Sequence, residues 1–429
     1  MPLGEVAGKV VETPAKQFQR VEDSAIGYVT VTAYGARGDG VTDDTAAFQA
    51  ALNAAAGNKV YVPGGHYVIN GTLSVPPYTV LMGTNEYPFN DWGHNNSQAA
   101  GSVLYAHAGR GSATGTPFIF LNGPAAGVKG MTLLYPDQDV NTAPPAVYPP
   151  CIQGSGNNLA VENMLLGNPW IGIDFATYSC PRHLISNVYG QPMYIGITVD
   201  QIYDIGRIRH IHFWPFWANA ATPAAKWQHN NAITFLFLRS DWEVVEDVFS
   251  WGYSRGMTFN KSSHGALNGQ FTDIDFDDVD VAIEIHSTQT PGILFSNLNI
   301  ANAGNGHIKT GIRCPAGTGH GAEAVFRGLS VWGQFETVVD WQCPGLFAIS
   351  SSLINQWNTN AGKPGMGFTD GRVSVQGNFF HHWGYPGGKV GVEIGPNVTR
   401  AIVTGNDFDG VTLTCPATST SVMCTNNLL

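Results

Sequence analysis

Positive charge is scarce in this sequence. Only 12% of the 429 residues are charged, and 21 Lys and Arg stand against 32 Asp and Glu, which gives a net charge of −11. Nucleic-acid binding needs clustered Lys and Arg to contact phosphates, so this composition excludes nucleic acid as a partner. The acidic balance also argues against a highly anionic polysaccharide.

Long apolar runs are missing as well. No run reaches the roughly 18 residues that a membrane-spanning helix needs, so no membrane partner is expected. The first residues, MPLGEVAGKVVETP, lack the apolar core of a signal peptide. We therefore expect either a cytoplasmic protein or a secreted, extracellular one whose leader peptide is absent from this chain, and the cysteines favour the second.

Cysteines are few, and their spacing is regular. The six form three pairs: Cys151 and Cys180 (29 apart), Cys314 and Cys343 (29 apart), and Cys415 and Cys424 (nine apart). If one coil of a repeat fold has about that length, each of the first two pairs would lie on adjacent strands. Strands about 4.8 Å apart are within the Cα reach of a disulfide. We expect three disulfides; six buried free thiols are the alternative.

A short pattern recurs along the chain. It has a hydrophobic residue, any residue, a turn-forming residue and then alternating apolar positions, as in VENMLL from Val161 and FSNLNI from Phe295. Recurrence at this period is typical of a solenoid. Gly, Asn and Asp dominate the third position because a tight bend needs a left-handed residue. The third positions are Gly130, Asn163, Asn187, His210, Asp247, Asp273, Asn297, Gly328, Ser351, Gly377 and Gly405.

A second set of short strands follows each repeat after a variable loop, as in GIDF from Gly172 and AIEI from Ala282. A small residue followed by alternating apolar residues fits a strand with one buried face. The outward positions should form a polar stripe: Asp174, Thr198, Thr234, Thr258, Glu284, Arg313, Asp340 and Glu393. The pattern predicts an all-β fold, a single-stranded parallel β-helix of about eleven coils.

The segment from Gly35 to Ala55 contains two adjacent carboxylates, Asp43 and Asp44. The residues from Ala46 to Ala56 favour a helix with one apolar face, and Gly57 suits its end. Asp43 and Asp44 then lie where side-chain oxygens cap the first turn of a helix. We expect them to be structural and not catalytic.

The stretches VTAYGARGDGVTDDTAAFQAALNAA and KVYVPGGHYVI (Lys59–Ile69) resemble the N-terminal signature of the pectate-lyase-like superfamily. That superfamily includes polygalacturonase-type hydrolases, polysaccharide lyases, epimerases and phage tailspikes, so the signature does not decide the reaction. The resemblance implies a right-handed parallel β-helix with an N-terminal capping helix. We expect one domain over residues 1–429: an N-terminal strand, helix and hairpin (1–70), early coils (71–126), regular coils (127–410) and a C-terminal cap (411–429).

One loop before the second strand set is acidic, within DIDFDDVDVAIEIH from Asp273 to His286. Glycosidic cleavage needs one protonated and one ionised carboxyl group, and clustered carboxylates raise the pKa of one member. We predict four catalytic residues: Asp277, Asp278, Asp280 and Glu284. A solvated turn or a calcium site is the alternative.

The motif DDVDVAI also resembles the aspartate pair followed by Val-Ala-Ile in polygalacturonase-type hydrolases, which implies that Asp277 and Asp278 are catalytic. Those hydrolases have a third aspartate in the preceding coil. Here that loop reads SWGYSRG, from Ser250 to Gly256, and contains no acid. A lower-ranked acidic cluster contains Asp241 and Glu243.

Aromatic and basic residues near the acidic loop are the expected substrate contacts. Exposed aromatic rings stack on sugar faces, although packing of the insertion that begins with FWPFW is an equal alternative. The predicted substrate-binding residues are Trp214, Trp217, Trp251, Tyr253, Arg255, His286, His307, Lys309 and Arg313.

Together these features predict a secreted carbohydrate-active enzyme that hydrolyses glycosidic bonds of a poly- or oligosaccharide, acting as a monomer or homotrimer. The first alternative is a lyase or epimerase on a uronate polymer, for which a calcium ion would be needed. The second is a non-catalytic, tailspike-like binding solenoid. No metal or other cofactor is expected for the hydrolase.

Overall fold

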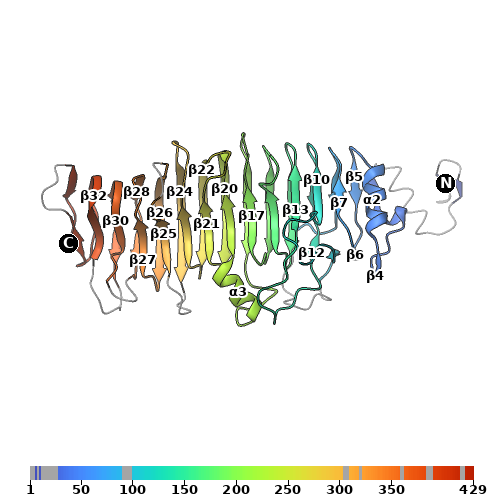
Figure 1. Cartoon of the computed structure of the whole chain (residues 1–429), viewed down its shortest axis with the longest axis horizontal. Helices are drawn as coiled ribbons and strands as arrows, with labels where there is room; N and C mark the ends of the chain where they lie inside the picture. The colour runs from blue at the N-terminus through green and yellow to red at the C-terminus, as the bar shows by residue number, and fades with distance from the viewer. Residues whose placement is uncertain are drawn as a thin grey trace.

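The chain forms one long column of stacked coils in the computed structural model, which describes residues 28–88, 99–302, 309–317, 321–357, 362–382, 390–415 and 421–429, together with the backbone of 5–6 and 9–10. The coils run from helix α2 (Thr45–Ala54) to strand β34 (Val422–Thr425), at opposite ends of the column (Figure 1). Neighbouring strands of the column pair in parallel, and only β1 (Glu5–Val6) and β2 (Lys9–Val10) are an antiparallel pair among the described strands. The predicted all-β fold, a right-handed parallel β-helix, is confirmed.

Three parallel sheets run along the column, and we name them sheets A, B and C. Sheet A contains β7 (Leu73–Val75), β10 (Ile119–Asn122), β13 (Pro150–Ser155), β15 (Ile171–Phe175), β17 (Ile195–Val199), β19 (Ile233–Phe237), β21 (Arg255–Phe259), β23 (Val281–Ile285), β25 (Thr310–Cys314), β27 (Thr337–Trp341), the first parts of β30 (Met366–Gln376) and β32 (Val390–Thr404), and β33 (Thr412–Thr414).

Sheet B contains β3 (Tyr28–Thr30), β5 (Lys59–Tyr61), β8 (Val80–Met82), β11 (Gly127–Lys129), the first parts of β14 (Ala160–Leu166), β16 (Leu184–Gly190), β18 (Arg207–Phe213), β20 (Ser240–Trp251), β22 (Leu267–Asp277), β24 (Ile293–Asn302) and β26 (Glu323–Gly333), then β28 (Leu346–Ser350), the last parts of β30 and β32, and β34. Sheet C contains β4 (Asp39–Asp43), β6 (Gly65–Ile69), β9 (Ser102–Ala106), β12 (Thr132–Leu134), the last parts of β14, β16, β18, β20, β22, β24 and β26, then β29 (Leu353–Asn355) and β31 (Phe379–His381).

The repeat found in the sequence is the bend between sheets B and C. All eleven predicted turn residues, from Gly130 to Gly405, have a positive φ, between 53° and 70°. Some of them bond across coils, since the side-chain amide of Asn187 donates to Asn163 at 3.0 Å. Alternating apolar residues face the interior, where Phe271 stacks on Phe295 with ring centroids 4.7 Å apart. These short-range features hold the coils in register.

The polar stripe of sheet A follows the predicted order with one correction. Its register runs through Asp174, Thr198, Leu236, Thr258, Glu284, Arg313, Asp340, Gly367 and Glu393. Thr234, which the sequence placed in this stripe, lies two residues earlier, in the row of Gly196 and Gly256. There it is buried and pairs with the hydroxyl of Ser250 at 2.6 Å.

The N-terminal helix spans Thr45–Ala54, and the two aspartates before it have different structural roles. Asp43 accepts a hydrogen bond from the backbone N–H of Thr45 at 3.0 Å, as a residue near a helix start does. Asp44 occupies the N-cap position, but its buried carboxylate accepts the backbone N–H groups of Arg37 and Gly38 at 2.7 and 3.1 Å. The predicted capping bond of Asp44 is therefore wrong, and its carboxylate fixes the loop before the helix.

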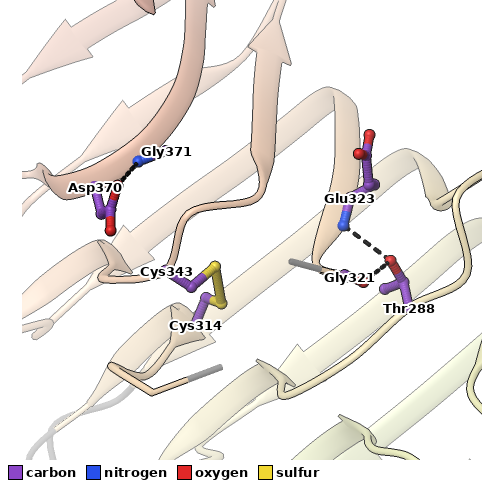
Figure 2. The surroundings of a disulfide bond; sticks show 7 residues. All are labelled: Thr288, Cys314, Gly321, Glu323, Cys343, Asp370 and Gly371. Atoms are coloured by element: carbon purple, nitrogen blue, oxygen red, sulfur yellow. Dashed lines mark hydrogen bonds between the residues drawn. A yellow bond between two sulfur atoms is a disulfide. The ribbon is translucent and has the colours of Figure 1, made fainter. Parts of the chain in front are cut away.

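Two of the three predicted disulfides form: Cys314–Cys343, between neighbouring coils (Figure 2), and Cys415–Cys424. Cys151 and Cys180 are buried free thiols, so this predicted bridge is wrong. The reason is coil length. Ile152 already pairs with Ile173 of the next coil, so Cys180 lies well past the position above Cys151. Cys314 pairs with Trp341, and Cys343 follows just beyond that position.

Helices contribute little to this architecture. Besides α2, a short 3-10 helix η1 (Val31–Tyr34) and the helix α3 (Pro223–Asn231) are described, and Figure 1 shows α3 projecting from one side of the column. In the part of the chain described here, no helix is long and apolar enough to cross a membrane.

Candidate functional site

The acidic loop connects the end of β22 in sheet C to the start of β23 in sheet A. Asp277 is the last residue of β22, and Asp278 has a left-handed backbone with φ of 52°. The loop is held by its neighbours, because the N–H of Asp278 donates to Ala301 and the N–H of Asp280 donates to Tyr253, at 3.1 and 3.3 Å. A non-glycine residue in this conformation is strained, and such residues are common at functional sites.

Two aspartates and a histidine converge on Lys309. Its ammonium lies 3.0 Å from Asp280 and 3.3 Å from Asp278, and its side chain is fully buried. His229 Nε2 lies 3.1 Å from the same oxygen of Asp280 and 3.1 Å from the Lys309 Nζ. A buried ammonium needs such partners, since an unpaired charge in the interior costs several kcal/mol. The sequence predicted Lys309 as a substrate contact, whereas the structure makes it a buried partner of two aspartates.

Helix α3 brings His229 to this cluster. Thr222 caps the helix, because its hydroxyl accepts the N–H of Ala225 at 3.3 Å, and Pro223 suits the first helical position. On the helix, the buried amide of Gln228 accepts a hydrogen bond from Gln191 at 2.7 Å, which ties α3 to the column. His229, the next residue, then faces Asp280.

The pKa values of Asp277 and Asp280 are shifted in opposite directions by their surroundings. Burial, followed by the negative charge of Asp278, raises the pKa of Asp277, although Lys309 offsets part of this increase. Burial also raises the pKa of Asp280, but the hydrogen bond from His229 and the charge of Lys309 outweigh it and lower that pKa. Neighbouring carboxyl groups with opposite pKa shifts are the arrangement that acid–base catalysis uses.

Glu284 belongs to a separate ion-pair cluster on sheet A. Arg255 Nε lies 2.9 Å from its carboxylate, Arg313 binds its other oxygen, and His286 lies 3.6 Å away. Burial alone raises the pKa of Glu284. His286, Arg255 and Arg313 together outweigh that effect and lower the pKa from 4.5 to about 2.

A cavity of about 340 Å³ lies between α3 and the acidic loop. It is lined by Pro215, Ala220, Ala225, Lys226, His229, Asn230, Trp251, Gly252 and Asp278. Trp251 stacks on Trp214, with ring centroids 6.1 Å apart and planes inclined by 20°. The structure therefore brings one predicted acid, Asp278, and one predicted aromatic residue, Trp251, to the same concave surface.

Two other predicted aromatic contacts are packing residues. Trp217 is almost fully buried, and its backbone N–H donates to Gln191. Tyr253 is fully buried, and its hydroxyl donates to the carbonyl of Pro192 at 3.0 Å. Their role as sugar-stacking residues is wrong, because the insertion packs them against the column.

One predicted substrate contact and the lower-ranked acidic cluster remain to be placed. His307 lies outside the described residues. Of the lower-ranked cluster, Glu243 is fully buried and pairs with His183 at 3.0 Å, while Asp241 binds Arg239. Neither belongs to the site.

Sequence reasoning missed His229 and the cavity wall that α3 forms. The only sequence signal was the Thr-Pro pair that starts this helix, and it does not reveal which coil the helix covers. Within the described ranges, no group of three or more His, Cys, Asp or Glu side chains is positioned to hold a metal ion.

Comparison with known proteins gives a family model and several relatives. Residues 28–119 match the model described as "Rhamnogalacturonase A/epimerase, pectate lyase-like". The N-terminal fragment of the bacteriophage phi29 gene product 12 has a similar structure, with a TM-score of 0.60 and 18% identity over 93% of this chain and 69% of that one. At this identity the likeness concerns the fold alone.

Curated relatives match over short stretches. The non-secreted LysM effector LysM19 of Penicillium expansum is 49% identical over 57 residues, which are 13% of this chain and 4% of that protein. A probable glucan endo-1,3-beta-glucosidase of Arthroderma benhamiae is 41% identical over 78 residues, which are 18% of this chain and 9% of that protein. The match thus spans less than a tenth of the length of either relative.

Proposed function

From its membership of the pectate-lyase-like superfamily of right-handed parallel β-helices and from the acidic loop, we propose that this protein is a carbohydrate-active enzyme that hydrolyses glycosidic bonds of a poly- or oligosaccharide. The similarity to a probable glucan endo-1,3-beta-glucosidase supports a glucan as the first substrate to test. The observation that carries the proposal is the placement of two adjacent acids: Asp277 is half-buried at the end of β22, and Asp278 lines the cavity with its carboxylate 3.3 Å from Lys309.

Asp277 is the proposed general acid. Burial and the neighbouring charge of Asp278 raise its pKa, which favours the protonated form. In the reaction its carboxyl proton passes to the glycosidic oxygen as the bond to the anomeric carbon breaks.

Asp278 is the proposed ionised partner. It lines the cavity, and the Lys309 ammonium lies 3.3 Å from its carboxylate. An ionised carboxylate at this place activates water or attacks the anomeric carbon. Asp280 and His229 position Lys309 by direct contact, and we assign them a supporting role.

Glu284 is assigned a positioning role in place of the catalytic one predicted from the sequence. Both of its carboxylate oxygens bind arginine side chains, Arg255 and Arg313. It joins the two cations, which lie on the coils on either side of its own in sheet A. Trp251, stacked on Trp214, is the proposed sugar-stacking surface.

A lyase or epimerase receives less support from these contacts. Either would need a basic residue to abstract a proton from a uronate. Arg255 and Arg313 both bind Glu284, and Lys309 is fully buried between two aspartates. A non-catalytic binding solenoid is the other alternative. It would need neither a half-buried acid such as Asp277 nor a second acid, Asp278, held beside Lys309 in the cavity.

We place the protein outside the cell, because disulfides such as Cys314–Cys343 and Cys415–Cys424 persist in oxidising compartments. No metal or other cofactor is assigned to the site. A monomer or homotrimer stays a prediction, which light scattering of the purified protein would test.

The test is product analysis on laminarin, mannan, polygalacturonate and alginate. The proposal predicts new reducing ends without unsaturated sugars from at least one of them. Ultraviolet absorbance from unsaturated ends would identify a lyase, and a change of sugar configuration without cleavage, seen by NMR, would identify an epimerase. Binding without any product would identify the non-catalytic alternative.

A further inference from the structure

We propose that the saccharide chain lies along the column axis on the outward face of sheet C, crosses Asp277, and stacks on Trp251 on one side and on Trp332 on the other. This inference rests on the proposed function and assigns the direction, the length and the charge class of the bound chain. Trp332 lies in β26, outside the set of residues that sequence reasoning connected with the acidic loop.

The strand register places these residues in one line, which we call the tryptophan row. Trp251 of β20 pairs with Asp277 of β22, Asp277 pairs with Ala301 of β24, and Ala301 pairs with Trp332 of β26. Neighbouring coils are about 4.8 Å apart, so three steps separate the two tryptophans by about 14 Å. That distance spans a short oligosaccharide, with the proposed acid between its two aromatic contacts.

The row faces solvent. The residues just before its members in the strands, Ser250, Phe276, Ile300 and Val331, are buried, so alternation directs the row outward. Trp332 is 55% exposed, so its ring is accessible to a ligand. Ala301, between Asp277 and Trp332, has a small side chain.

A second cavity adjoins the far end of the row. It measures about 540 Å³ and is lined by Trp332, Leu353, Asn355, Gln356 and His381. Aromatic and apolar surface with a few amide groups is the usual composition of a sugar-binding site. The cavity between α3 and the acidic loop contains Trp251, so the tryptophan row connects the two cavities.

The lining indicates a neutral chain. None of the five residues around this second cavity is a Lys or Arg, and the row itself contains one carboxyl group and no cation. A uronate carboxylate placed there would find no Lys or Arg in the row or in the cavity lining to compensate its charge. A neutral glucan or mannan meets no such penalty.

The experiment measures dissociation constants and cleavage rates for laminarin, mannan, polygalacturonate and alginate with the parent and three variants. Trp332→Ala removes the stacking ring, Trp332→Phe keeps an aromatic ring, and Trp242→Ala is the matched control. Trp242 is 56% exposed but lies in the first part of β20, away from the row. Circular dichroism confirms that each variant is folded.

The proposal predicts that Trp332→Ala weakens binding of a neutral polysaccharide by about 2- to 10-fold, the range for loss of one aromatic contact. Trp332→Phe should restore most of it, and Trp242→Ala should match the parent. Cleavage of a substrate too short to reach from Asp277 to Trp332 should be unchanged in all variants.

Three results would overturn the inference while leaving the hydrolase intact. These are equal binding by Trp332→Ala and Trp242→Ala, cleavage confined to polygalacturonate or alginate, and a loss of oligomeric mass in Trp332→Ala with unchanged sugar binding. The last would make this face a contact between copies of the chain. If the parent neither binds nor cleaves any of the four polysaccharides, the proposed function itself fails, and the inference with it.

Discussion

Replacing Glu284 with Gln tests the ion-pair cluster of Glu284, Arg255 and Arg313 on sheet A. The variant keeps the shape of the side chain but leaves Arg255 and Arg313 without their shared counter-ion. The surroundings lower the pKa of Glu284 from 4.5 to about 2, which corresponds to about 3 kcal/mol of folding stability.

The lowered pKa of Glu284 decides how its contribution to stability depends on pH. Because the pKa is lower in the folded state, the stabilisation is present above about pH 4.5 and is lost as the pH falls toward about 2. Glu284→Gln should therefore be less stable than the parent by about 3 kcal/mol at neutral pH, and the difference should shrink near pH 2.

Urea denaturation at a series of pH values measures this difference. Glu393→Gln is the control, because Glu393 occupies the same row of sheet A and is exposed. Equal stability of parent and Glu284→Gln at neutral pH, or a difference that does not depend on pH, would refute the reasoning.

Three further predictions concern other parts of the chain. Peptide mapping after alkylation in denaturant without reductant should label Cys151 and Cys180 and leave the other four cysteines unlabelled; labelling of all six, or of none, would contradict the fold. Asp44→Ala should cost about 1–3 kcal/mol in urea denaturation, because two backbone N–H groups lose a buried acceptor, and more than Asp43→Ala, whose carboxylate is exposed. The rate of cleavage should fall at alkaline pH as Asp277 loses its proton. Because Lys309 lowers the pKa of Asp277, Lys309→Met should move this fall in rate to higher pH. A pH–rate profile that does not move, or that moves to lower pH, would exclude Asp277 as the acid.

The fold could be predicted from the sequence because its determinants are short-range. A left-handed turn residue such as Asn163 or Asp273 is required by its own bend and does not depend on distant contacts. The sequence also located the acidic loop, since Asp277, Asp278 and Asp280 are neighbours in the chain. The length of each coil was harder to predict from the sequence. Cys180 follows Cys151 at the same spacing as in the bonded pair Cys314–Cys343, but the coil that begins at Cys151 is shorter, so the two thiols do not meet.

The rest of the site depends on which coils lie beside each other. His229 reaches Asp280 across a long stretch of sequence because α3 packs back on the column, and Lys309 approaches the same carboxylate from the following coil. Tyr253 and Trp217 were predicted as exposed sugar contacts, but the same insertion buries them. Exposure and contact across coils are tertiary properties, so local patterns could not separate Trp251 from Tyr253.

The rate of glycosidic cleavage by Asp277→Asn and Asp278→Asn shows whether these two carboxyl groups carry out the reaction. Asp273→Asn is the control, because Asp273 lies on the same strand at a turn where the next coil carries Asn297. On a polysaccharide that the parent cleaves, we expect a loss of about 10²- to 10⁴-fold for both site variants and a near-parent rate for Asp273→Asn. Near-parent rates for Asp277→Asn and Asp278→Asn would contradict this expectation.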